Sequence, residues 1–221
     1  MDAGAGHPSP PAATTKKSLI ASERDPWARV RFAVEQQAVA AEDLVVIDEF
    51  GSNRDMTRRD ARAAPGERAV AAIPRNTPPN TTTISSLTTS GMGPSMVTVA
   101  GVTTKVFEAY IEHILGPTLR PGQIVLLDNL SAHKSPRLRQ LLADRGCQLW
   151  SLPSYSPDFS PIELAFAKIK AVLRRLGART PAALETAIAQ ALTHILPEEA
   201  WAFFRHGGFR VLPDLAQWFC S

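Results

Sequence analysis

The sequence predicts an α/β domain with a mixed central sheet of about five strands flanked by helices. Its first support is a pair of short segments, Leu44–Phe50 and Ile124–Asp128, which are apolar on both faces until their ends, as strands covered by helices on both sides are. The second is the region between Arg75 and Lys105, which carries no charge, is rich in Thr, Ser, Ile and Val, and predicts a strand, a hairpin turn and a strand. The third is the order of the elements: strands come first, helix and strand then alternate, and helices finish the chain.

One kind of helix start recurs along the chain, a Ser, Thr or Asp immediately before a proline. Such pairs favour the first turn of a helix, so helices are predicted to begin at four places. These are Asp25, Ser135, Ser160 and Thr180. In the first helix the apolar residues recur at helical spacing and predict an amphipathic helix that enters the main domain. They are Trp27, Val30, Val34 and Ala38.

Two further elements complete the expected fold. A helix is predicted from four apolar residues on one face, and Gly116-Pro117 ends it. The four are Phe107, Ile111, Ile114 and Leu115. The segment Cys147–Leu152 has the pattern of a third buried strand.

The composition limits the class of protein. A chain of 221 residues, 44% of them hydrophobic, can bury a core without cross-links, and its two cysteines are too few for a disulfide framework or a four-ligand zinc site. No run approaches the ~18 apolar residues of a membrane span, so we expect a cytoplasmic protein with no membrane partner. We expect residues 1–22 to be a disordered lead-in, 23–42 a helical connector, 43–210 the main domain and 211–221 a C-terminal tail.

Two aspartates close the predicted central strands. Alternation places Val46 and Asp48 on one face of the first strand, and Leu126 and Asp128 on one face of the second. If the strands are parallel neighbours, the aspartates lie side by side where open α/β sheets place ligands. Either aspartate alone is better explained as the start of a turn after a strand, and only the pair favours a shared site.

A third carboxylate, Glu163, follows Ser160-Pro161 at the start of a predicted helix. Ser160 and Glu163 have the spacing of a capping box, so Glu163 has a purely structural interpretation. The apolar stripe of this helix, however, leaves Glu163, Lys170 and Arg174 on an adjacent face. That stripe is Ile162, Phe166, Ile169, Leu173 and Leu176.

Three carboxylates from separate elements suit hard, oxygen-seeking Mg²⁺, and paired ions of this kind support phosphoryl transfer. The segment from Leu164 to Leu184 adds five positive charges and no negative one. Such a run is commonly a solvated helix face, but beside a metal site it can contact a phosphate backbone. The candidate DNA-backbone residues are Lys168, Lys170, Arg174 and Arg175.

Other enzyme classes lack their motifs. The phosphate-binding loop of P-loop ATPases and the G-x-S-x-G elbow of serine hydrolases are both absent from the 221 residues. Cys147 falls within a predicted buried strand, which argues against a cysteine nucleophile.

From about Asp43 to Phe209 the chain resembles the bacterial insertion-sequence (IS six-thirty) branch of the mariner-like DDE transposases. The resemblance rests on VVIDEF around Asp48, IVLLDNLSAHKS around Asp128, LPSYSPDFSPIEL, which contains Glu163, and FFRHGGF near the end. It implies a ribonuclease H-like fold for residues 43–210. By position, the catalytic triad of the family carries over to Asp48, Asp128 and Glu163, with 34 residues between the last two.

The resemblance also implies chemistry and partners. The triad would bind two Mg²⁺ or Mn²⁺ ions and serve cleavage and strand transfer of DNA at terminal inverted repeats, with insertion at a TA dinucleotide, by a homodimer. Asn129 and His133 match family positions beside the second aspartate and are expected to support it, although both fit turn or packing roles equally well.

The chain departs from the family in two respects. Ser160 stands where the family usually has Asn, but the two residues cap helices about equally well. Only 47 residues precede Asp48, too few for the helix-turn-helix region of the family. We therefore expect the catalytic part alone, joined to or paired with an upstream-frame helix-turn-helix polypeptide. The alternative is a truncated, non-catalytic DNA-binding or assembly remnant.

Overall fold

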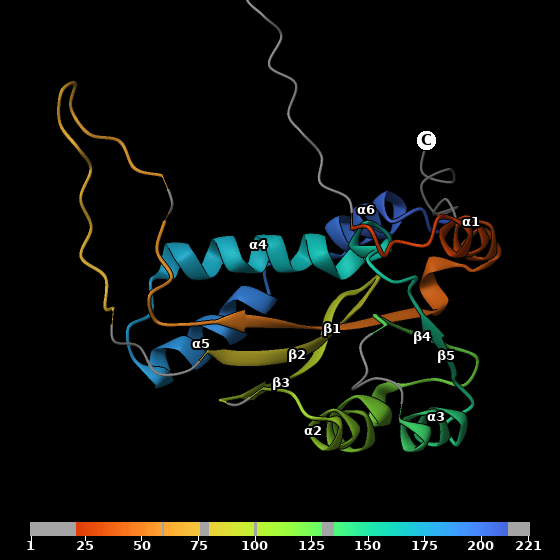
Figure 1. The fold of residues 1–221 in the computed structure, drawn as a ribbon. Coiled ribbons are helices and arrows are strands. Elements are labelled where there is room, and N and C mark those ends of the chain that lie inside the picture. The colour runs from red at the N-terminus through yellow and green to blue at the C-terminus, as the bar shows by residue number, and fades with distance from the viewer. Residues whose placement is uncertain (1–20, 59, 76–79, 100, 130–134, 212–221) are drawn as a thin grey trace, which may run out of the picture.

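The computed structural model describes residues 21–58, 60–75, 80–99, 101–129 and 135–211. A five-stranded sheet lies at its centre in the order β3-β2-β1-β4-β5 (Figure 1). The strands are β1 (Leu44–Ser52), β2 (Thr81–Thr88), β3 (Gly91–Thr98), β4 (Ile124–Leu127) and β5 (Gln148–Ser151). Strand β1 pairs antiparallel with β2 and parallel with β4, so the predicted mixed sheet is confirmed.

Helices cover both faces of this sheet (Figure 1). On one side lie α1 (Pro26–Glu35), α4 (Pro161–Leu176), α5 (Pro181–Leu192) and α6 (Pro197–His206); on the other lie α2 (Thr104–Ala109), its π-helical continuation Tyr110–Leu115, and α3 (Pro136–Ala143). The four predicted Ser/Thr/Asp-Pro starts are confirmed, because α1, α3, α4 and α5 each begin at such a proline. None of the described helices is long and apolar enough to cross a membrane.

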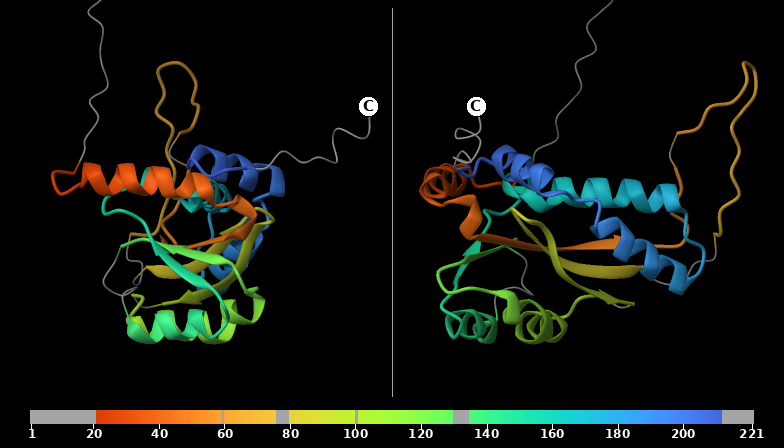
Figure 2. Two further views of the ribbon diagram at one scale, coloured as in Figure 1. Left: turned by 90° about the vertical axis from the view of Figure 1, so that its right-hand side faces the viewer. Right: turned by 180° about the vertical axis from the view of Figure 1, so that it is seen from behind.

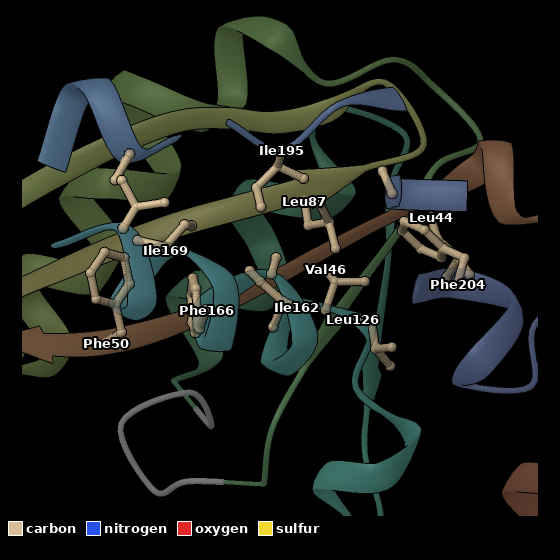
Figure 3. Close-up of a cluster of buried hydrophobic side chains, with 14 of the residues drawn as sticks. Leu44, Val46, Phe50, Leu87, Leu126, Ile162, Phe166, Ile169, Ile195 and Phe204 are labelled. Carbon is tan, nitrogen blue, oxygen red and sulfur yellow. The ribbon is translucent and has the colours of Figure 1, made fainter. Parts of the chain in front are cut away.

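The apolar character of β1 on both faces follows from its central place. Val46 and Phe50 enter the core beneath α4, α5 and α6, while Val45 and Ile47 enter the core beneath α2 and α3. Figure 3 shows the first core, in which the Phe50 and Phe166 rings lie 4.7 Å apart between centroids. Two packed layers therefore fix β1, which carries the first candidate carboxylate.

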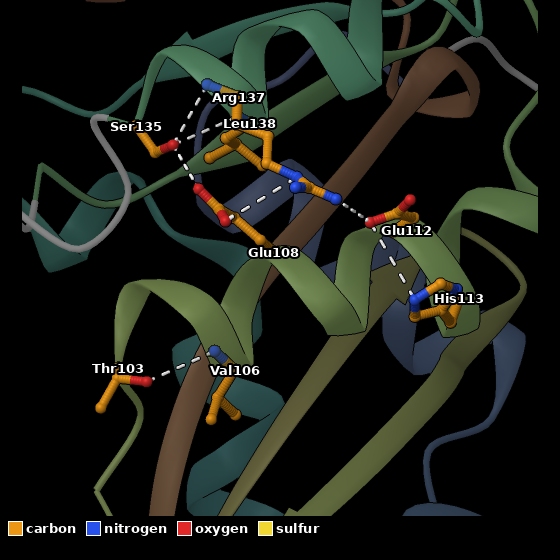
Figure 4. A network of polar contacts seen from close by, with 8 residues as sticks. All are labelled: Thr103, Val106, Glu108, Glu112, His113, Ser135, Arg137 and Leu138. Carbon is orange, nitrogen blue, oxygen red and sulfur yellow. Dashed lines mark hydrogen bonds and ion pairs between the residues drawn. The ribbon is translucent and has the colours of Figure 1, made fainter.

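A polar network joins α3 to α2 and to its π-helical continuation (Figure 4). Ser135 caps α3 and donates a hydrogen bond to Glu108, while the Arg137 guanidinium lies 2.6 Å from a Glu112 carboxylate oxygen. The hydrogen bond from Arg137 lowers the pKa of Glu112 below its usual value. This network fixes the first turn of α3 at the point where the chain returns from β4.

Two predictions about packing are wrong. On α1 the residues predicted to form the apolar face are exposed, Trp27 by 78%, Val30 by 56% and Val34 by 69%, whereas Phe32 is buried. The reason is that α1 lies at the periphery and contacts the body through Phe32, whose ring meets those of Trp150, Phe159 and Phe209.

The third strand is also not buried. Strand β5 occupies the sheet edge, and its residues are exposed or half-buried, because it pairs on one side only, with β4. The C-terminal residue of the predicted α4 stripe, Leu176, is 39% exposed where the helix runs past the core.

Candidate active site

The two aspartates stand level with each other at neighbouring strands. The parallel register pairs Leu44 with Ile124 and Val46 with Leu126, and its continuation brings Asp48 opposite Asp128, the first residue after β4. Both line one cavity of about 500 Å³. Asp48 lies within β1 and not at its end, because pairing with β2 carries β1 on to Ser52 after β4 has stopped.

Glu163 reaches the same cavity from the first turn of α4. The Ser160 side chain makes no capping hydrogen bond, and the Glu163 N–H donates to the Ser160 carbonyl at 3.3 Å. The capping box allowed by the sequence is therefore not formed. Burial of Ile162 and Phe166 beside it sets the rotation of α4 that leaves the Glu163 carboxylate at the cavity.

The electrostatics of Asp48 reflect its burial and its acidic neighbours. Burial is the largest cause that raises the pKa of Asp48, a backbone hydrogen bond from Glu49 at 2.7 Å lowers it, and the negative charges of Asp128, Glu49 and Glu163 raise it; together they bring it to about 7. A buried carboxylate with acidic neighbours favours either a proton or a bound cation.

The donor set fits a divalent metal ion of the Mg²⁺ or Mn²⁺ type. All three groups are carboxylates, the ligands such hard ions prefer, and they line a single cavity. In their present positions, no three His, Cys, Asp or Glu side chains among the described residues stand close enough to hold an ion together.

Asn129 connects the end of β4 to the loop that forms one wall of the cavity. Its Nδ2 donates a hydrogen bond of 2.7 Å to Ser154 Oγ, and both residues line the cavity. This contact gives Asn129 a positioning role towards the loop. His133, the other predicted supporting residue, lies outside the described residues.

The four candidate DNA-backbone residues on α4 do not share one surface. Lys170 lines the carboxylate cavity and also a second, polar cavity of about 340 Å³, where Arg174 joins it. Arg175 is exposed and lines neither cavity. Lys168 lies elsewhere: its Nζ contacts the Glu199 carboxylate at 2.5 Å and the His194 carbonyl at 2.7 Å.

Sequence reasoning missed two residues of the carboxylate cavity, Glu49 and Tyr155. Glu49 follows Asp48 directly, and strand alternation argued against its facing the same side. Tyr155 stands inside the LPSYSPDFSPIEL block, where only Glu163 was singled out. Glu49 could have been found from its position beside Asp48, whereas Tyr155, well before Glu163 in the block, had no such local signal.

The loop that carries Tyr155 is anchored to α1. Arg29 makes two hydrogen bonds to Asp158, of 3.0 and 2.6 Å, and its guanidinium lies 4.2 Å from the centroid of the Phe159 ring. Arg24 also contacts Asp158, at 2.8 Å. Helix α1 thereby braces the segment that leads into Glu163.

We expect Asp158→Asn to destabilise the protein by about 0.5–1 kcal/mol at pH 7, a modest value because the Asp158 side chain is 50% exposed. Burial raises the pKa of Asp158, but the hydrogen bonds and charge of Arg29 outweigh it and lower the pKa below its usual value. The stabilisation is therefore present above the unfolded pKa and disappears as the pH falls through the folded one. Thermal unfolding of Asp158→Asn and Asp60→Asn, an exposed control, at pH 7 and pH 2 measures this. A cost that persists at pH 2 would contradict the ion pair as its cause.

The model of the DDE superfamily endonuclease family matches residues 43–185. No protein of curated function matches the chain in sequence.

Among solved structures, the fold is similar to that of the Mos1 mariner paired end complex with Mn, with a TM-score of 0.68 and 15% identity over 90% of this chain and 64% of that one. The Mos1 strand transfer complex gives a TM-score of 0.67 at 15% identity, covering 90% of this chain and 63% of that one. The structure of the Mos1 transposase catalytic domain with Raltegravir and Mn gives a TM-score of 0.59 at 13% identity, and the match covers 82% of this chain and 85% of that one.

These likenesses confirm the predicted ribonuclease H-like fold. The chain spans 64% of the length of the first Mos1 chain. Since the family model covers well over half of the sequence, the chain belongs to the DDE superfamily endonuclease family.

Proposed function

We propose that this protein is the catalytic domain of a DNA transposase of the bacterial insertion-sequence (IS six-thirty) branch, acting by metal-dependent DNA cleavage and strand transfer at the ends of its element. The observation that carries the proposal is the convergence of Asp48, Asp128 and Glu163 on one cavity. The Mos1 structures of similar fold include complexes with Mn and with Mg, and a strand transfer complex, which supports the same chemistry here.

In this proposal Asp48, Asp128 and Glu163 hold two Mg²⁺ or Mn²⁺ ions. Such ions, when bound, neutralise charge on a phosphodiester and lower the pKa of the attacking water or hydroxyl. The chain contributes position: the parallel register fixes Asp48 against Asp128, and α4 brings Glu163 to them. Asn129 holds the loop opposite, through Ser154.

The partner is DNA, both the terminal inverted repeats of the element and a TA-containing target. Lys170 and Arg174 supply the cationic surface beside the carboxylates, and we leave Lys168 out of it because Glu199 already neutralises its charge. A homodimer across two DNA ends and an upstream-frame helix-turn-helix polypeptide complete the proposed assembly, which would act at the nucleoid in the cytoplasm.

We expect Lys170→Ala and Arg174→Ala each to reduce the salt dependence of DNA binding by about one unit in the slope of log K against log salt, because each removes about one phosphate contact. Arg175→Ala, on the same helix but outside both cavities, is the matched control and should leave the slope near its wild-type value. Fluorescence anisotropy with a labelled duplex at several salt concentrations measures it. Equal salt-dependence slopes for all three variants would mean that Lys170 and Arg174 contact DNA no more than Arg175 does. This face of α4 would then be removed from the proposed DNA surface.

The function itself is tested by nicking of plasmid DNA that carries terminal repeats, with Mg²⁺, with Mn²⁺ and with EDTA. The proposal expects nicks with either ion, none with EDTA, and 3′-hydroxyl ends on the product. Binding of the plasmid without any nicking, with the upstream polypeptide present, would favour the alternative of a non-catalytic remnant.

A further inference from the structure

Tyr155 combines an unusual backbone with an exposed ring. Among the described residues it is the one non-glycine with a positive φ, 54°, a conformation that most side chains avoid. Its side chain is also 58% exposed, although tyrosine usually buries its ring. A strained residue held in an exposed position points to a use for that position.

The loop holds Tyr155 from both sides. Ser154 accepts the hydrogen bond from Asn129, and Ser156 is buried and donates to the Ser154 carbonyl at 3.2 Å. Beyond Ser156, Asp158 is fixed to α1 by Arg29. The ring is thus presented by a pinned backbone, so little freedom is lost when something binds to it.

The surroundings of the ring indicate what binds there. Tyr155 lines the cavity of the three carboxylates together with Pro153 and Pro157, which give that part of the wall an apolar surface. Lys170 lines the same cavity and supplies a cation. An apolar, aromatic wall beside a cation and metal-ligand carboxylates matches a nucleotide, whose base has a flat π-face and whose phosphate carries the charge.

We propose that Tyr155 is a positioning residue on which a nucleobase next to the scissile phosphate stacks. This inference rests on the proposed function and deepens it, since it names the part of the DNA that the cavity wall holds. Stacking is tolerant of base identity, so it positions the strand without reading its sequence.

Binding of a fluorescein-labelled single-stranded oligo(dT), compared with an abasic oligomer of the same length, tests the proposal in EDTA, where no cleavage occurs. Tyr155→Phe keeps the ring and should bind oligo(dT) as the wild type does. Tyr155→Gly and Tyr155→Ala should bind it about 5- to 100-fold more weakly. The loss should disappear with the abasic oligomer, which keeps the phosphates but has no base to stack.

Tyr155→Gly separates stacking from loop structure, because glycine adopts the positive φ without strain and lacks only the ring. Trp27→Ala, which removes an exposed aromatic in the first turn of α1, outside the carboxylate cavity, is the control and should change neither affinity. Wild-type affinity of Tyr155→Gly for oligo(dT), or an equal loss with both oligomers, would overturn the proposal. The proposal would also be overturned if Tyr155→Gly lost self-association while keeping DNA binding, because the ring would then be a contact between protein chains.

The result of this binding test does not depend on the result of the nicking test of the proposed function. A chain that never nicks DNA but loses base-dependent binding on Tyr155→Gly would keep the stacking role and refute the nuclease. A metal-dependent nuclease whose Tyr155→Gly variant binds both oligomers normally would do the reverse.

Discussion

Asp48→Asn, Asp128→Asn and Glu163→Gln should each lower metal-dependent nicking of terminal-repeat DNA by on the order of 10³-fold or more. Each substitution removes a negatively charged oxygen ligand from a cavity that offers three of them from separate elements. Neither asparagine nor glutamine supplies the charge that a hard divalent ion requires. The rate of conversion of supercoiled to nicked plasmid is the measurement.

Glu185→Gln is the matched control for this series, because Glu185 is an exposed carboxylate on the neighbouring helix α5, outside the cavity. It should nick at the wild-type rate. The three site variants should also retain the wild-type circular dichroism spectrum, which excludes unfolding as the cause. Undiminished nicking by any one of them would remove that residue from the triad.

Although Asp48→Asn should strongly lower nicking activity, it should stabilise the fold. We expect it to raise the free energy of unfolding of the metal-free protein by roughly 2–4 kcal/mol at pH 8. The folded-state pKa of Asp48 is about 7, above its ordinary value of 3.8, because of burial and the neighbouring acids. Between these two pH values the folded protein binds a proton that the unfolded chain has released. The stability of the wild type therefore falls as pH rises through this window, and the neutral asparagine avoids that loss.

Urea unfolding in EDTA at pH 8 and pH 4 measures this effect, with Asp60→Asn as an exposed control. The advantage of Asp48→Asn should disappear near pH 4, where the carboxyl is protonated in the folded state and half protonated in the unfolded one. With Mn²⁺ added, the wild type should gain stability by mass action and the variant should gain less. An Asp48→Asn protein no more stable than the wild type at pH 8 would contradict the electrostatic account of the cavity.

The sheet and two of the three carboxylates were predictable because their signals are local. The apolar runs of β1 and β4 each end near an aspartate, and the parallel pairing of these two strands brings the aspartates together. Glu163 was ambiguous, since its sequence fits a cap as well as a site. The rotation of α4, set by the burial of Ile162 and Phe166, is what places its carboxylate at the cavity.

What the sequence did not reveal depends on long-range contacts. The exposed face of α1 was misassigned because Phe32 and Arg29 meet partners more than a hundred residues away, such as Asp158 and Phe159. The run of cations on α4 did not show that Lys168 pairs with Glu199 of α6. The positive φ of Tyr155 also has no signature in residue type, because it follows from the anchoring of the loop on both sides.

The central claim is that Asp48, Asp128 and Glu163 form one metal site. Mn²⁺ binding followed by electron paramagnetic resonance tests this claim most directly, because the measurement needs neither DNA nor activity. The account predicts saturable binding by the wild type and by Glu185→Gln, and affinity at least about tenfold weaker for each of the three site variants. Unchanged Mn²⁺ affinity in all three site variants would contradict it.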